Sequence, residues 1–224
     1  MQKATGVPIG IINCSRGASI VEAWMPEEAL KSIPEGREML EWYQNQLQDY
    51  DQKYAKFKAD MEEFNRTYKN PQDFLEEQNR CRQAGKKVPI KPFVPVGPEH
   101  PHCVTGLYNA QIAPMTGFRL KGVIFYQGES NSPRADKYAA LLTTMIKAWR
   151  KTFDDPDLIF VQTQLPNYGK TFPNCRENEW ANLRFAQYQA TKLLPDLGMV
   201  VTIDLGDPVN IHPANKKDDI YLSI

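Results

Sequence analysis

The chain has 224 residues, and its 27 basic and 27 acidic side chains give a formal net charge of zero. This balance excludes the basic surface that a nucleic-acid backbone or an anionic membrane needs, so we expect neither as a partner. Hydrophobic residues make up 42% of the chain, which is enough for a buried core. No apolar run approaches the roughly 20 residues of a membrane-spanning helix.

The first predicted element is a strand over residues 7–14, which are mostly apolar, as in a strand buried on both faces. A loop of small residues follows and contains Gly17. Because glycine has no side chain, the Gly17 N–H can come close to a ligand oxygen, although glycine serves equally well simply to turn the chain. Residues 20–24 then begin the return over the predicted sheet.

Residues 35–100 differ from the rest of the chain in their hydrophobic pattern, which predicts a helical hairpin inserted into the domain. Apolar side chains recur there at steps of three and four, the pattern of a helix with one narrow apolar seam. The seam consists of Leu40, Tyr43, Leu47, Tyr50, Tyr54, Phe57, Met61, Phe64 and Tyr68. We expect one unbroken helix of at least about 30 residues, a shorter helix over residues 71–84 and an extended proline-rich return. The aromatic side chains favour packing within the chain over a two-stranded coiled coil.

Strands and helices alternate in the rest of the chain. We expect helices over residues 107–113, 133–153 and 178–194, and strands over residues 121–126, 157–165 and 198–204. Such alternation predicts a parallel sheet with helices packed against it and right-handed connections between the strands.

The junction that follows residues 121–126 is the most informative stretch. The apolar residues give way abruptly to small and polar ones, among them Glu129 and Asn131, and then to Pro133 and a helical pattern. In open α/β sheets, ligands bind at the carboxyl ends of the strands. We therefore expect Glu129 and Asn131 at the mouth of a site.

Several segments of the chain resemble the conserved blocks of the SGNH hydrolases, and most closely those of the sialate O-acetylesterase branch of carbohydrate esterases. Residues 126–131 resemble the third block, residues 10–25 the second, and residues 204–213 the last. Residues 107–114 also fit the pattern. A single block would be weak support, but several blocks in the family's order are strong support.

The resemblance implies an α/β fold of the flavodoxin-like type, with a three-layer parallel sheet. We expect the esterase domain to comprise residues 1–34 and 101–224, with residues 35–100 as the inserted hairpin. The family's first strand, which carries the nucleophile block, has no counterpart before residue 7. The chain is therefore predicted to be a piece of a longer esterase, whose parent protein we expect to be periplasmic or secreted rather than cytoplasmic.

The resemblance also assigns roles to individual residues. His212 would be the general base, because an imidazole can take a proton from a hydroxyl near neutral pH and return it to the leaving alcohol. The Gly17 N–H and the Asn131 side-chain amide would donate to the oxyanion of the tetrahedral intermediate. The residues expected to bind the substrate are Gln127, Glu129 and Arg184. We expect no cofactor and no metal.

The group that orients the base is open to alternatives. Many relatives carry an aspartate two residues before the histidine, where this chain has Asn210. Asp207 is our prediction for the orienting acid, and Asp204 is the other nearby carboxylate. A backbone carbonyl could also hold the imidazole.

The nucleophile is the missing part, because the family uses a serine in a Gly-x-Ser-Asn-type block that comes before the second block, and no such block precedes residue 7. Ser130 lies in a sequence that faintly resembles a nucleophile elbow, without its final glycine. The expected function is therefore the removal of O-acetyl groups from sialic acid or a related sugar. The alternatives are a hydrolase that uses Ser130 and a non-catalytic carbohydrate-binding remnant in which Asn131, Arg184 and Gln187 hold the ligand.

The remaining candidate ligands suggest no metal centre. His100 and His102 flank a proline just after the insertion, but no third ligand cluster follows them, so a structural or rim position is favoured. The cysteines are scattered without metal-site spacing and are expected to be unpaired, partly buried thiols. They are Cys14, Cys81, Cys103 and Cys175.

Overall fold

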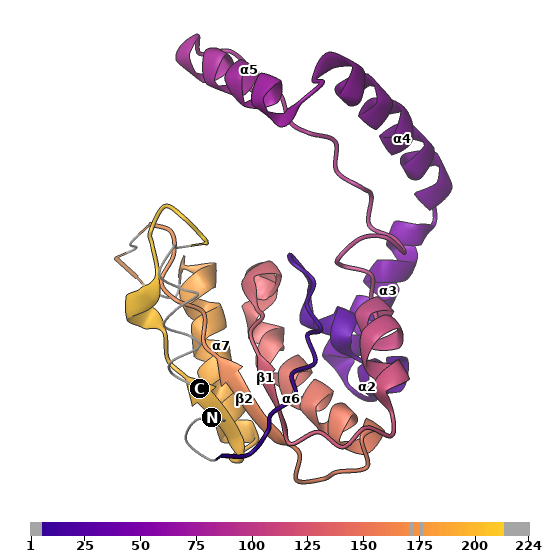
Figure 1. Ribbon diagram of the computed structural model, residues 1–224, viewed down its shortest axis with the longest axis vertical. Coiled ribbons are helices and arrows are strands. Elements are labelled where there is room, and N and C mark those ends of the chain that lie inside the picture. Colours follow the sequence, from indigo (N-terminus) through magenta and orange to yellow (C-terminus); the bar gives the residue numbers. More distant parts are fainter. Residues whose placement is uncertain (1–5, 171–172, 175–176, 213–224) are drawn as a thin grey trace. The chain divides into compact units, whose positions relative to one another are not determined.

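The computed structural model describes residues 6–170, 173–174 and 177–212 (Figure 1). The chain divides into two compact units, of which the smaller is Glu41–Cys103. The larger unit comprises Met1–Leu40 and Val104–Ile224.

The larger unit is built on a parallel sheet, as the alternation of elements predicts. Its strands are β1 (Gly122–Phe125), β2 (Ile159–Thr163) and β3 (Leu197–Val200), which pair in the order β1-β2-β3. The register places Val123 beside Phe160 and Phe160 beside Leu197. Because the strands are parallel, their carboxyl ends lie along the same edge.

Helices α6 (Ala135–Thr152) and α7 (Glu179–Leu193) connect these strands and pack against each other (Figure 1). Helix α6 forms where predicted because its apolar side chains recur on one face. The buried members of that face are Tyr138, Leu141, Leu142, Met145, Ile146 and Trp149. Helix α7 begins at Asn178, whose side-chain oxygen accepts the N–H groups of Trp180 and Ala181 and so satisfies the exposed helix start.

The core centres on Trp149. Its indole ring lies 5.8 Å from the ring of Phe160 and 6.4 Å from that of Phe125. Its N–H donates to the main-chain oxygen of Trp24 at 2.8 Å. Trp24 ends the short 3-10 helix η1 (Val21–Trp24), which packs on α6 and is followed by α2 (Glu27–Ser32). The bond to Trp149 thus ties η1 to the sheet-covering helix.

The strand predicted over residues 7–14 is wrong. These residues have no regular structure, and Val7 and Ile11 are 58% and 89% exposed. A strand needs a neighbour to complete its backbone hydrogen bonds, and none of β1, β2 and β3 pairs with this segment. On the sheet face opposite Phe160, Ile124 and Ile159 are about half exposed.

Two other predicted elements differ from the structure in detail. The strand expected over residues 198–204 is β3 followed by a 3-10 turn at Ile203–Leu205. The helix expected over residues 107–113 is a short π-helix at Tyr108–Ile112, followed by a 3-10 turn at Ala113–Met115. Pro114 lies in that turn, which is where the prediction ended the helix.

The hairpin region contains three helices, α3 (Pro34–Leu47), α4 (Tyr50–Thr67) and α5 (Pro71–Gln83). The prediction of one unbroken first helix is wrong, because the chain turns between α3 and α4. The break escapes the sequence pattern because Leu47 and Tyr50 keep the spacing of three. Helix α5 starts as predicted, with Pro71 in its first turn and the Asn70 side chain accepting the Asp73 N–H at 2.9 Å.

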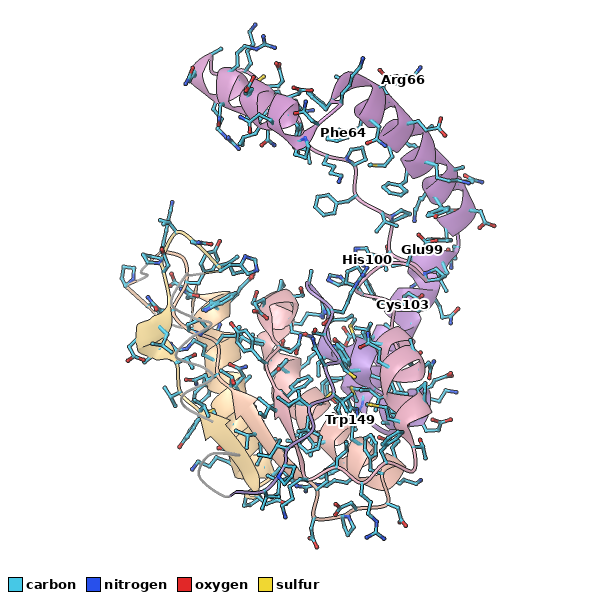
Figure 2. The ribbon with its side chains drawn as sticks, in the orientation of Figure 1. Phe64, Arg66, Glu99, His100, Cys103 and Trp149 are labelled. Carbon is cyan, nitrogen blue, oxygen red and sulfur yellow. The ribbon has the colours of Figure 1, made fainter. Side chains whose placement is uncertain are left out.

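The aromatic seam of α4 packs within the smaller unit, as predicted. The Phe64 ring lies 5.0 Å from the rings of Tyr68 and Phe74. Lys91 of the proline-rich return lies over the Phe64 ring, and Phe64 lies on the side of α4 that faces this return (Figure 2). The Tyr54 hydroxyl donates to Glu99 near the end of the return at 2.9 Å. The hairpin's own chain therefore covers the seam in part and leaves its side chains half-buried.

Three of the four cysteines lie in the described part of the chain. Cys14, Cys81 and Cys103 form no disulfide, as predicted, and Cys81 is buried while the other two are half-buried. Cys175 lies outside the described residues. In the described part of the chain, no helix is both long enough and apolar enough to cross a membrane.

Candidate active site

The carboxyl ends of the strands are joined by side-chain hydrogen bonds. Gln187 of α7 donates its amide to the main-chain oxygens of Gln127, beyond β1, and Thr163, at the end of β2, at 3.2 and 3.4 Å. The Thr202 hydroxyl, beyond β3, donates to the main-chain oxygen of Gln164, beyond β2, at 2.5 Å. These bonds hold the polar loops that follow the three strands along one edge of the sheet.

Gly128 allows the loop after β1 to bend sharply. Its φ of +149° is rarely adopted by residues with a side chain, and a Cβ there would lie 2.8 Å from Leu183 Cδ2. The chain then enters the short 3-10 helix η4 (Glu129–Arg134), which contains Asn131. A groove beside η4 is lined by Ser132 and, from α7, Phe185 among others.

Asn131 lies at the centre of a buried polar network and has no exposed surface. Its side-chain oxygen accepts the Val21 N–H at 2.9 Å and the Gln127 amide at 2.8 Å. Its side-chain nitrogen donates to the Glu22 carboxylate at 2.9 Å. For Asn131 to donate to an oxyanion, the ligand oxygen must reach an amide that these neighbours enclose.

Gln127 is also buried, and its side chain is bonded inside the protein. Its amide nitrogen donates to the Ser19 carbonyl at 2.9 Å, and its side-chain oxygen accepts the Tyr138 hydroxyl at 3.0 Å. Burial raises the pKa of Tyr138, so this hydroxyl keeps its proton and remains a donor. Sequence reasoning missed Glu22 and Tyr138 as site partners, because Glu22 is 109 positions from Asn131 and Tyr138 reads as one more apolar position of α6.

Glu129 and His212 lie within electrostatic reach of each other. Burial raises the pKa of the Glu129 carboxyl, and the positive charge of a protonated His212 works in the opposite direction. The His212 residue itself is exposed. This electrostatic interaction links the loop that carries His212 to the loop after β1, and the role of His212 as the base stays a prediction.

The loop that carries His212 is shaped by side-chain caps. Asp207 accepts the N–H groups of Val209 and Asn210 at 2.8 and 3.2 Å, and Asn210 accepts the His212 N–H at 2.9 Å. Gly206 packs so closely on Asn167 that a Cβ would lie 2.1 Å from its oxygens. Asp207 thus forms the turn before the histidine, and its role toward the imidazole stays a prediction.

Gly17 is exposed, with open space where a side chain would be. Nearby serine hydroxyls are engaged with groups other than His212. Ser15 donates to Asn13, Ser19 accepts the indole N–H of Trp24, and Ser130 donates to the carbonyl of Ala18. These bonds fix the orientation of the loop that contains Gly17.

Arg184 points toward the end of β2. Its guanidinium donates to the Gln164 side-chain oxygen at 3.2 Å, and its main-chain oxygen accepts the Gln164 amide at 2.9 Å. Burial lowers the pKa of this guanidinium. Its predicted contact with the substrate stays a prediction.

The two histidines after the insertion contact each other. His100 accepts the His102 N–H at 2.9 Å through its ring nitrogen, and the two rings meet edge to face at 4.6 Å (Figure 2 labels His100). Across the described residues, no group of three or more histidine, cysteine, aspartate or glutamate side chains is arranged to hold a metal ion.

Comparison with known proteins identifies the family. A family model described as carbohydrate esterase, sialic acid-specific acetylesterase, matches residues 87–217, which is more than half of the chain. The chain belongs to this family. Within the acetylesterase match lie Gln127, Asn131, Arg184 and His212, whereas Gly17 lies before it.

Individual acetylesterases agree with this assignment. The sialate O-acetylesterases of Rattus norvegicus and Mus musculus are 28% and 27% identical to the chain, each over 96% of its length and 38% of their own. The solved structure of a carbohydrate acetylesterase from Xanthomonas citri matches with a TM-score of 0.61 and 29% identity, covering 99% of this chain and 37% of that one. The chain thus spans less than half the length of these relatives.

The buried Glu129 carboxyl gives the stability of the protein a testable pH dependence. Because its carboxyl has a raised pKa in the folded protein, the folded state holds this proton more tightly than the unfolded state. Its contribution to stability is therefore largest below the usual pKa of 4.5 and is lost as the pH rises through the raised value. Glu129→Gln should gain stability relative to the wild type as the pH rises from about 4 to about 7.

Urea unfolding of both proteins at several pH values measures this difference. Glu179→Gln, at an exposed position on α7, is the matched control and should show no such trend. A stability difference for Glu129→Gln that stays constant or falls with rising pH would contradict the prediction.

Proposed function

We propose that the protein is a carbohydrate esterase that removes O-acetyl groups from sialic acid or a related sugar. The observation that carries the proposal is the family match over residues 87–217, which includes both the loop after β1 and His212. The names of the rat and mouse relatives point to sialic acid as the sugar. An exported location, periplasmic or secreted, is our proposal for the whole protein and has the family as its only support.

In this proposal, His212 takes the proton of the attacking hydroxyl and returns it to the sugar oxygen that leaves. The Gly17 N–H and the Asn131 amide donate to the oxyanion, and Asp207 orients the base. The exposure of Gly17 and His212 supports their access to a substrate. The electrostatic link between Glu129 and His212 supports their meeting at one site.

The proposal is tested by measuring acetate release from O-acetylated sialic acid and from 4-nitrophenyl acetate. The assay is run on the 224-residue chain and on the longest in-frame polypeptide that contains it. Turnover by either form supports the esterase, and turnover by neither overturns it. A serine-reactive phosphonate then identifies the nucleophile, and labelling of Ser130 would assign that role to the loop after β1.

A second function, carbohydrate binding without cleavage, is favoured by one observation. Asn131 and the hydroxyl of Ser130 are engaged within the protein, where Ser130 bonds to Ala18 and not to His212. Isothermal titration with the acetylated and the free sugar distinguishes the two functions. Sugar binding without hydrolysis, and unchanged by His212→Ala, would establish the binding function in place of the esterase.

A further inference from the structure

Glu22 is a fully buried carboxylate beside the proposed site. One of its oxygens accepts the Asn131 amide at 2.9 Å, and the other lies 3.6 Å from the Arg134 guanidinium. The Glu22 main-chain oxygen accepts the Thr105 N–H at 3.1 Å. A charge removed from water is expensive unless it is paired, so the few partners of this carboxylate define its position closely.

The two ends of the Asn131 amide are held by consecutive residues of η1. The Val21 N–H requires the oxygen end on its side, and the Glu22 carboxylate, which can only accept, requires the nitrogen end on the other. Gln127 adds a second donor to the oxygen. The amide therefore has a single orientation, and only one of its two N–H groups is used by Glu22.

We propose that Glu22 is a positioning residue of the esterase site. Its carboxylate fixes the Asn131 amide and thereby holds the segment that carries Gly17 at a set distance from the loop that carries Glu129. This inference rests on the proposed function, because it assumes that these two segments act on one acyl group. Glu22 itself need not touch the substrate.

The test compares Glu22→Ala, Glu22→Gln and Leu30→Ala in whichever form turns over. Glu22→Ala should lower kcat by about 100-fold with little change in KM, since misplacement by about 1 Å costs that much. Glu22→Gln, which keeps an acceptor for the Asn131 amide, should recover most of kcat. Leu30→Ala removes a fully buried side chain of α2 outside this network and should keep the kcat of its folded fraction.

Hydrogen exchange at the Val21 amide provides a readout that does not need activity. The N–H of Val21 should lose protection in Glu22→Ala and keep it in Leu30→Ala. Unchanged protection, or an unchanged kcat in Glu22→Ala, would overturn the positioning role. If the wild type shows no turnover in either form, the proposed function fails, and exchange at Val21 still decides whether Glu22 holds the amide.

Discussion

In whichever form releases acetate, His212→Ala should lower kcat by a factor on the order of 10²–10⁴, because the hydroxyl nucleophile then has no base to take its proton. KM should change little, since the imidazole acts on the transferred proton more than on the bound sugar. The stability of the protein should stay within about 0.5 kcal/mol of the wild type, because His212 is exposed. Stopped-time acetate assays and urea unfolding measure the two effects.

A matched control separates this effect from a change in the loop. Val209→Ala, also exposed in the same loop, should leave kcat near the wild-type value. Full activity in His212→Ala would mean that another group is the base. Loss of activity in both variants would mean that the loop conformation, and not the imidazole, is what the assay reports.

Asn131→Asp should destabilise the protein by about 3–5 kcal/mol at neutral pH, although the two side chains have almost the same shape. The change replaces the donor that faces Glu22 with a second acceptor, so two carboxylates would oppose each other in a fully buried place. Lowering the pH should recover part of this loss, because protonation of one carboxyl restores a donor. Urea unfolding at about pH 7 and about pH 5 measures both effects.

Asn109→Asp is the matched control for this prediction. It introduces the same charge at an exposed amide of the larger unit and should change stability by no more than about 0.5 kcal/mol. Equal losses in the two variants would show that added charge alone is responsible. A loss in Asn131→Asp that does not shrink at acidic pH would argue against carboxylate repulsion.

The sequence was sufficient for the elements whose pattern is local. The apolar face of α6 repeats every three or four residues from Tyr138 to Trp149, and the helix forms there with that face buried. Asn70 and Asn178 stand at helix starts, where their side chains cap the first turn. Family membership was also predictable, because its blocks are contiguous and in order.

The sequence was insufficient where an element depends on a partner. Residues 7–14 have the composition of a strand, but a strand also needs a neighbouring strand that completes its backbone hydrogen bonds, and composition says nothing about that neighbour. The pairing of Glu22 with Asn131 joins residues 109 positions apart, and a single sequence carries no sign of it. Asn131 was predicted as a substrate-facing donor, whereas its complete burial emerges only from the packed structure.

The way in which Gln127 is held has a consequence for altering substrate preference. The Gln127 side chain bonds to Ser19 and Tyr138, and its main-chain oxygen accepts the Gln187 amide. A replacement at position 127 would therefore disrupt the packing of these loops as well as any contact with the substrate. Ser132 and Phe185 line the neighbouring groove, and neither takes part in these hydrogen bonds of Gln127. Libraries that diversify these groove positions should retain foldable members far more often than libraries centred on Gln127.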